Sequence, residues 1–246
     1  MDETNTSGAA AGRRVHVNPD ALPATLLALT YVTGLVDAVS FLGLGRTFTA
    51  NMTGNVVILG FAVAGTPGLS IARSLTSLIA FIAGAAIGGR VAAFIGGGTK
   101  RRWLLTVASA ESALLFAAAF ATLNYHVAGT APTRSLYAVI IPMAIAMGIR
   151  NATARKLAVP DLSTTVLTQT LTGIAADSSL AGGNNPLLGR RVVSVAAMFA
   201  GAASGALLIR FGLALPLILS GLCVLMATAI CAYLEWHLDN ARSAGA

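Results

Sequence analysis

Charged residues are scarce in this chain. Only 10% of its 246 residues are Asp, Glu, Lys or Arg, whereas 56% are hydrophobic. A soluble domain carries about 25% charged residues, so this chain cannot cover a folded surface with polar side chains. The scarcity excludes an ordinary soluble protein and predicts an all-α bundle that crosses a membrane several times.

Cysteine and histidine are also rare. Cys223 and Cys231 fall in the last apolar stretch without other metal-type ligands, and we interpret them as small apolar residues. His16, His126 and His237 lie in the tail or near the ends of apolar stretches, which disfavours a proton relay built on histidine. No nucleophile–base set and no metal-ligand cluster appears, so the sequence predicts neither an enzyme nor a bound cofactor.

Basic residues outnumber acidic ones, which gives a net charge of +7. No aromatic-rich basic surface accompanies them, so we do not expect a nucleic-acid partner. In membrane proteins such an excess collects in cytoplasmic loops. The partner that the composition predicts is the lipid bilayer.

Six stretches are long and apolar enough to span the hydrocarbon as helices, which takes about 20 residues each. Two further stretches, 48–64 and 162–180, are shorter and richer in Ser, Thr and Asn. Residues 1–20 and 239–246 are read as polar tails. The six expected spans are 22–44, 75–95, 103–123, 136–155, 192–210 and 213–236.

Related segments recur about half a chain apart. The Thr-rich segment 49–56 has a counterpart at 164–171, and 34–38 (GLVDA) aligns with 148–152 (GIRNA). An Ala/Gly-rich segment, 81–88, aligns with 198–205, and a Pro/Gly turn follows each polar stretch. Chance explains one match between Ala/Gly-rich helices, but four in the same order indicate a duplication. We therefore expect two membrane repeats, 21–130 and 131–238.

Basic residues favour one of two topologies. If all eight stretches cross the membrane, the basic segments 100–102 and 155–156 lie outside, against the usual preference for the cytoplasm. If the two polar stretches enter and return, these segments and the N-terminus are cytoplasmic. The sequence therefore favours six spanning helices in two inverted repeats with two polar re-entrant segments, and bent full helices are the alternative.

Polar segments at matching places in two halves are the best sequence indication of a substrate or ion site in a transporter. We expect the two segments to face each other near the membrane midplane. Hydrogen bonding between helices is the other role of such side chains. The residues expected to line the path are Asn51, Thr53, Gly54, Asn55, Thr165, Thr168, Gln169 and Thr170.

Ionisable residues inside membrane helices are costly and indicate functional sites by default. Asp37 lies inside the first span, and its repeat equivalent is Asn151, next to Arg150. We expect Asp37 to pair with Arg150, either as a coupling charge or as a static ion pair. Contact with an anion is the alternative role of Arg150. Glu111 is a further intramembrane carboxyl group, able to carry protons but without an indicated partner.

Two surfaces of small residues allow helices to approach closely. They are Gly84-x-x-x-Gly88 and Gly201-x-x-x-Gly205. Packing within the bundle is their expected use. A seam between two copies in a homo-oligomer is the alternative.

The segments 34–41 (GLVDAVSF) and 48–55 (FTANMTGN) resemble the signature of the YoaK-like family of bacterial integral membrane proteins. The segments 150–152 (RNA) and 164–168 (TTVLT) are similar to that family's second characteristic region. The resemblance covers nearly the whole chain after the first tail and implies a multi-pass protein of the bacterial inner membrane. Gln169 stands where the family pattern has Gly, which makes the two Thr-rich copies unequal.

The polar segments and the intramembrane charges predict a secondary transporter or channel for a small solute or ion, with a cytoplasmic N-terminus. The alternative is a non-transporting membrane scaffold or an assembly partner of an envelope complex.

Overall fold

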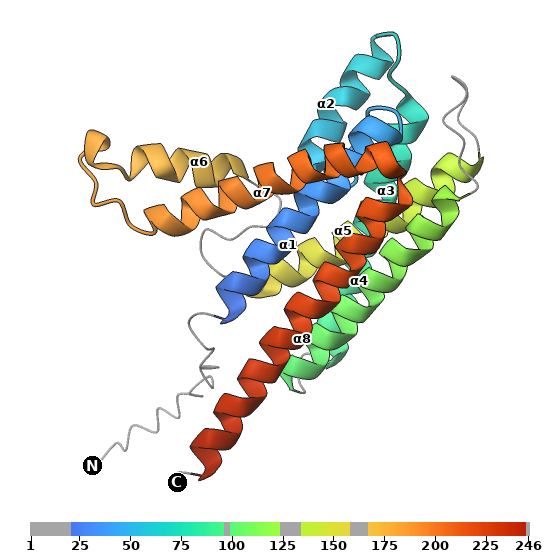
Figure 1. Cartoon of the computed structure of the whole chain (residues 1–246). Helices are drawn as coiled ribbons and strands as arrows, with labels where there is room; N and C mark the ends of the chain where they lie inside the picture. Colours follow the sequence, from blue (N-terminus) through green and yellow to red (C-terminus); the bar gives the residue numbers. More distant parts are fainter. Residues whose placement is uncertain (1–20, 96–98, 124–133, 158–166, 245–246) are drawn as a thin grey trace, which may run out of the picture.

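The computed structural model describes residues 21–95, 99–123, 134–157 and 167–244, and this part is helical without strands (Figure 1). The all-α prediction is confirmed. The α-helices are α1 (Ala21–Ala38), α2 (Met52–Val63), α3 (Ile71–Ile95), α4 (Lys100–Thr122), α5 (Arg134–Leu157), α6 (Leu167–Ala176), α7 (Leu188–Leu208) and α8 (Ala214–Ala244). A five-residue π-helical turn, Val39–Gly43, continues α1.

In the described part of the chain, six helices are long and apolar enough to cross a membrane, in agreement with the six expected spans. They are Leu22–Gly43, Ile71–Ile95, Lys100–Thr122, Arg134–Leu157, Leu188–Phe211 and Ala214–His237. The remaining helices, α2 and α6, have 12 and 10 residues. At 1.5 Å per residue they are about 18 and 15 Å long, too short for a hydrocarbon core of about 30 Å.

Helices from the two halves of the chain are packed against each other. The first helix of each half lies against the second span-length helix of the other half, so that α1 packs on α7 and α5 packs on α3. The packing of α5 on α4 likewise corresponds to the packing of α1 on α8. The last helices of the two halves, α4 and α8, pack on each other. Buried apolar side chains of α1, α4, α5 and α8 form the main core, including Val32, Leu115 and Met143.

Glycine makes both cross-half packings possible. A Cβ at Gly34 would collide with the carbonyl oxygen of Met198 on α7, and a Cβ at Gly148 would collide in the same way with that of Phe81 on α3. Gly201 meets the carbonyl oxygen of Tyr31, and Gly84 meets that of Ile145. The two small-residue surfaces predicted from the sequence are thus used inside the bundle.

The contacts between α4 and α8 show that these two helices run antiparallel. Lys100, at the start of α4, has its Nζ 3.3 Å from a carboxylate oxygen of Glu235, near the end of α8. Further along, the Ser112 hydroxyl donates to the carbonyl oxygen of Gly221 at 2.9 Å. Lys100 and Ser112 therefore meet residues in the reverse order along α8.

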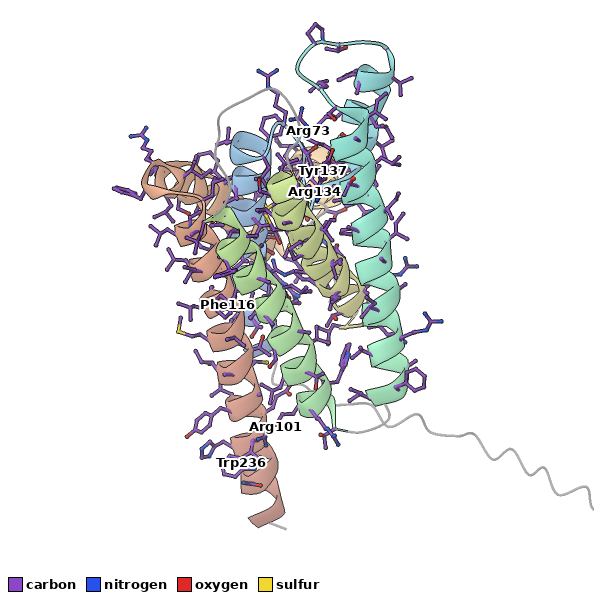
Figure 2. All side chains as sticks on the ribbon, turned by 90° about the vertical axis from the view of Figure 1, so that its right-hand side faces the viewer. Arg73, Arg101, Phe116, Arg134, Tyr137 and Trp236 are labelled. Carbon is purple, nitrogen blue, oxygen red and sulfur yellow. The ribbon has the colours of Figure 1, made fainter. Side chains whose placement is uncertain are left out.

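Arginine side chains lie at both ends of the bundle, as expected for helices that cross a bilayer. Figure 2 places Arg101 and Trp236 near one end, and Arg73 and Arg134 near the other. Large apolar side chains on the span-length helices, such as Phe94, Phe120 and Phe199, are exposed. Figure 1 also shows α6 and the first half of α7 extending away from the other helices.

Candidate functional site

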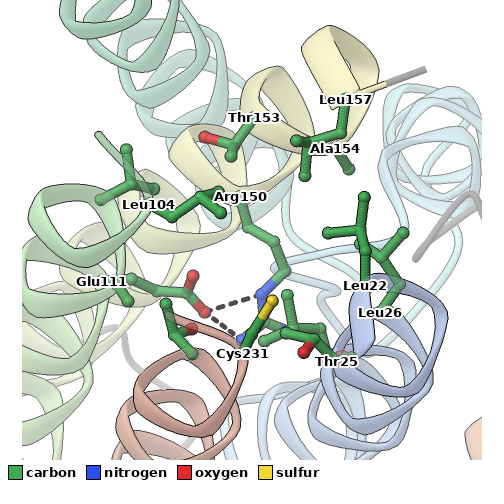
Figure 3. A pocket seen from close by; sticks show the side chains of 14 residues that line it. Leu22, Thr25, Leu26, Leu104, Glu111, Arg150, Thr153, Ala154, Leu157 and Cys231 are labelled. Atoms are coloured by element: carbon green, nitrogen blue, oxygen red, sulfur yellow. Dashed lines mark hydrogen bonds and ion pairs between the residues drawn. The ribbon is translucent and has the colours of Figure 1, made fainter. Parts of the chain in front are cut away.

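A buried ion pair joins α4 to α5 in the core of the bundle (Figure 3). Glu111 and Arg150 are 2% and 1% exposed, so both charges are removed from solvent. The Arg150 Nε donates to the Glu111 Oε1 at 2.6 Å, and the Arg150 Nη2 donates to the same oxygen. A buried pair of this kind depends on good geometry and on further hydrogen bonds, because both ions lose their hydration.

Those further bonds come from α1. The Arg150 Nη1 donates to the carbonyl oxygen of Leu29 and to the Thr33 hydroxyl, each at 3.0 Å. The guanidinium therefore ties three helices together. Thr25, Leu29 and Thr33 are spaced by four residues along one face of α1, which therefore lies toward the ion pair and its surroundings.

The expectation that Arg150 pairs with Asp37 is wrong, because its ion pair is with Glu111. The Asp37 carboxylate instead accepts a hydrogen bond from the backbone N–H of Ala50 at 2.9 Å, and the N–H groups of Thr49 and Asn51 also interact with it. Neighbouring residues on a helix point about 100° apart. Arg150 therefore does not share the direction of Asn151, the residue that aligns with Asp37.

The first polar motif holds the backbone before α2 in a fixed conformation. The Asn55 amide donates to the carbonyl oxygen of Phe48 at 2.6 Å and accepts from the Phe48 N–H at 2.9 Å. The Ser77 hydroxyl on α3 donates to the same carbonyl at 2.6 Å. Asn51 caps α2 by accepting from the Gly54 N–H at 3.2 Å. This motif therefore satisfies backbone groups where the chain is not helical, as membrane proteins require.

Two other residues of the motif are placed differently. Gly54 lies against the Phe48 ring, and a Cβ there would come within 2.8 Å of a ring carbon. Thr53 is exposed. Among the described residues, only part of the predicted path-lining set is thus directed into the protein.

The second polar motif is less completely described. Thr165 lies outside the described residues, Thr168 and Gln169 are exposed, and Thr170 is buried. The Asn151 amide donates to the Met147 carbonyl oxygen at 2.9 Å. The two motifs do not form the face-to-face arrangement expected from the sequence within the described part of the chain, because α2 packs on α3 and α6 packs on α7.

A small cavity of about 40 Å³ adjoins the ion pair. Leu22, Leu26 and Leu157 give it largely apolar walls, and Glu111 and Arg150 supply its charges (Figure 3). The remaining polar side chains of its lining are Thr25, Thr153, Thr228 and Cys231. This volume has room for about three water molecules or one small ion.

The cavity lies toward the end of the bundle where α1 and α4 begin and α5 ends. Leu22 and Leu104 are near the first residues of α1 and α4, and Leu157 is the last residue of α5. Cys231, which the sequence suggested to be an inert packing residue, is 1% exposed and lies in this lining. Thr153 and Thr228 were not identified from the sequence at all.

A further ion pair lies away from this cavity, on the α6–α7 hairpin. The Arg191 Nη1 donates to the Asp177 Oδ2 at 2.7 Å and to the Gly173 carbonyl oxygen at 2.6 Å. The Asp177 side chain is 44% exposed, so this pair contributes little to stability. In the part of the chain that the structure describes, no three His, Cys, Asp or Glu side chains are grouped as metal ligands would be.

Comparison with known proteins places this architecture in a family. A family model described as "Protein of unknown function (DUF1275)" matches residues 25–230, which include all six span-length helices in whole or in large part. The chain belongs to the DUF1275 family. Over 159 residues, 63% of this chain and 67% of the relative, it is 39% identical to the UPF0700 transmembrane protein YoaK of Bacillus subtilis (strain 168). No solved structure matches the chain.

The six apolar helices and the transmembrane relative together establish this DUF1275 protein as a multi-pass membrane protein. The resemblance to the YoaK-like family noted from the sequence is confirmed.

Proposed function

We propose that this protein is a secondary transporter or channel for a small solute or ion in the bacterial plasma membrane. The observation that carries the proposal is the buried Glu111–Arg150 pair beside a cavity inside the bundle. Charges at membrane depth in a helical bundle are expensive, and they typically belong to a substrate or ion pathway. Polar and charged groups at a small cavity between helices are also the usual composition of a ligand site.

An inverted duplication is part of the proposal. Gly34 and Gly148 approach the backbone of their partner helices in the same way. Gly34 lies against Met198 and Ala202, and Gly148 lies against Phe81 and Ala85. The same offsets, 114 between the first helices and 117 between their partners, relate the contacts of Gly34 to those of Gly148 and the contacts of Gly201 to those of Gly84. The antiparallel arrangement of α4 and α8 supports inversion, since equivalent helices of parallel repeats would point the same way.

The proposed orientation has the N-terminus in the cytoplasm. The basic residues Lys100, Arg101 and Arg102 begin α4, and Arg155 and Lys156 end α5. They lie at the end of the bundle where α1 starts, and basic residues favour the cytoplasmic side. In this orientation the cavity faces the cytoplasm.

The polar motifs have a supporting part in this proposal. Asp37 and Asn55 hold the 48–51 backbone, so that they keep the entry to α2 rigid beside the helices that carry the charges. The side chains of Asp37 and Asn55 are fully used in hydrogen bonds to the backbone. This observation favours the alternative function, a membrane scaffold without transport. In the scaffold, the Glu111–Arg150 pair is a static tie between helices.

Flux measurements separate these two functions. The full chain is reconstituted in liposomes, and small solutes and ions are screened for uptake. The matched control is the double variant Glu111→Val with Arg150→Val, which removes both charges together and leaves no unpaired ion. Transport predicts a solute that crosses with the native protein and not with the control at equal incorporation.

Cys231 provides an independent measurement of access. With Cys223 replaced by Ser, a small thiol reagent is added to sealed membrane vesicles of either orientation, and Cys231→Ser gives the background. Transport predicts that Cys231 reacts from the cytoplasmic side. A failure of every solute to cross, together with an unreactive Cys231, would leave the scaffold as the function.

A further inference from the structure

Within the residues that the structure describes, the crossing of α4 and α5 contains an ion pair, whereas the matching crossing of α8 and α1 does not. Arg150 follows Gly148 by two residues, and Val36 follows Gly34 by two, where both glycines make matching contacts with their partner helices. Val36 is fully buried. At this second crossing α1 packs against α8, which contains no acidic residue before Glu235 and therefore no counterpart of Glu111. The crossing therefore does not need an ion pair in order to pack.

Stability alone does not account for the charges either. Replacing a buried ion pair with apolar residues is often neutral or stabilising, because the desolvation of two ions offsets their attraction. Val36 is such an apolar solution at the equivalent place. A pair that is retained beside a cavity is better explained by something that binds there.

The hydrogen bonds of Arg150 divide into two groups. Nη1 is held by the Leu29 carbonyl and the Thr33 hydroxyl of α1, whereas Nε and Nη2 both donate to one oxygen of Glu111. If Glu111 takes up a proton, its carboxyl group loses the charge that binds the guanidinium. The α1 contacts still hold the guanidinium in place, and its Nε and Nη2 donors then form a two-pronged site for an anion.

The surrounding groups do not replace the lost negative charge. α8 contributes the thiols of Cys223 and Cys231, which interact with Arg150 and Thr25 respectively. Its Glu235 also acts on Cys231, but that carboxylate is paired with Lys100 of α4 at 3.3 Å. From α1, Asp37 acts on Arg150 only at longer range and is occupied by the backbone at Ala50. The buried residues of α3 are Ser74, Ser77, Ala80, Gly84, Gly88 and Ala92, none of them charged.

We infer that the cavity binds a small monovalent anion on Arg150 in place of the ionised Glu111 carboxylate, so that one proton and one anion enter together. The proton adds to a Glu111 oxygen, Arg150 stays charged, and the net charge of the site is zero before and after. A cavity of about 40 Å³ suits an ion of the size of chloride, nitrate or formate. Coupled movement across the membrane rests on the proposed transport function, whereas binding does not.

The test measures anion binding to the purified full-length protein in detergent. Chloride, nitrate and formate are titrated as sodium salts against gluconate at constant ionic strength, between pH 5 and 8, with thermal stabilisation as the readout. In the range where Glu111 is ionised, the native protein should lose affinity by about tenfold per pH unit, because each anion needs one proton. Glu111→Gln should bind the anion without pH dependence, and its advantage over the native protein should grow by about tenfold per pH unit in the range where Glu111 is ionised.

Two controls complete the test. The double variant Glu111→Val with Arg150→Val should fold with a similar Tm and bind none of the three anions. Asp177→Asn removes a carboxylate of the α6–α7 hairpin, outside the cavity, and should leave the affinity unchanged. Anion binding to the native protein that does not depend on pH, or no binding to Glu111→Gln while the native protein binds, would overturn the inference.

The outcomes also separate this inference from the proposed function. Anion binding that depends on pH but is not accompanied by flux supports the inference and contradicts transport. Flux of another solute, with no binding of the three anions, supports transport and contradicts the inference.

Discussion

The side chain of Asn55 hydrogen-bonds both the N–H and the carbonyl of Phe48, which in a helix would bond to other backbone groups. Its amide both donates to the Phe48 carbonyl and accepts from the Phe48 N–H, and Asn55 itself is fully buried. A buried backbone group without a partner is costly, and there is no water in the hydrocarbon to supply one. The residue therefore acts on stability directly.

Replacing Asn55 with Ala should lower the free energy of unfolding by about 2 kcal/mol, because the Phe48 N–H loses its partner and the Phe48 carbonyl keeps only the Ser77 hydroxyl. For a chain of this size that corresponds to a fall in Tm of roughly 4–8 °C. Thermal unfolding in detergent measures it. Thr53→Ala, two residues away and exposed, should change the stability by less than about 0.5 kcal/mol. Equal effects of the two substitutions would contradict the assigned role of Asn55.

At the scale of helices, the contacts of α1 with α7 and of α3 with α5 depend on glycine at their closest points. At these points the helices meet through their backbones, since Gly34 and Gly201 each approach main-chain atoms of the other helix. Close approach of this kind is a main source of helix association in membranes, where apolar side chains gain little by leaving lipid. The crossings should therefore tolerate substitution poorly.

Gly148→Ala should separate α5 from α3 and destabilise the protein by about 1–3 kcal/mol, since its Cβ would meet backbone atoms that cannot move aside easily. Gly89→Ala on α3 is the matched control, because a Cβ there meets nothing within 4 Å. In the control, alanine should be neutral or stabilising by about 0.5–1 kcal/mol. Chemical or thermal unfolding of both variants checks the pair, and the same effect at both positions would count against the crossing as described.

The sequence predicted the helices better than the partners of their polar residues. The six spans follow from apolar length alone, so their ends agree with the structure to within a few residues. The ion pair of Arg150 depends on Glu111, 39 residues away on another helix, and no local pattern encodes that contact. Repeat alignment directed attention to Asp37 instead. Similarly, the sequence suggests that Asn55 lines a path, whereas the structure shows it bonded to the backbone of Phe48. No sequence pattern indicates a bond to a backbone group.

For the whole molecule, the proposed topology depends on the short length of α2 and α6. In the proposed inverted arrangement neither helix crosses the membrane, and a chain that enters at α2 returns on the same side. The turn after α2 and the turn after α6 then lie on opposite sides of the membrane in an inverted arrangement.

Single cysteines at Thr66 and Asn184, both exposed, test this arrangement in a background without Cys223 and Cys231. With a membrane-impermeant thiol reagent on intact cells, Thr66→Cys should react and Asn184→Cys should not. Inside-out vesicles should reverse the result. Labelling of both positions from the same side would mean that α2 and α6 complete crossings, and the inverted arrangement would be wrong.

The exchange of helices between the halves also sets an order of events during synthesis. Tyr31 on α1 finds its hydrogen-bond partner, Ser204 on α7, only 173 residues later in the chain. At a ribosomal rate of about 5–20 residues per second, α1 waits in the membrane for roughly 10–35 seconds before its glycine face can be covered. During that interval α1 lacks its partner α7, whereas α3 and α4 receive their partner α5 earlier in synthesis. The nascent protein is then open to membrane proteases and chaperones, and the arrival of α7 ends this exposure.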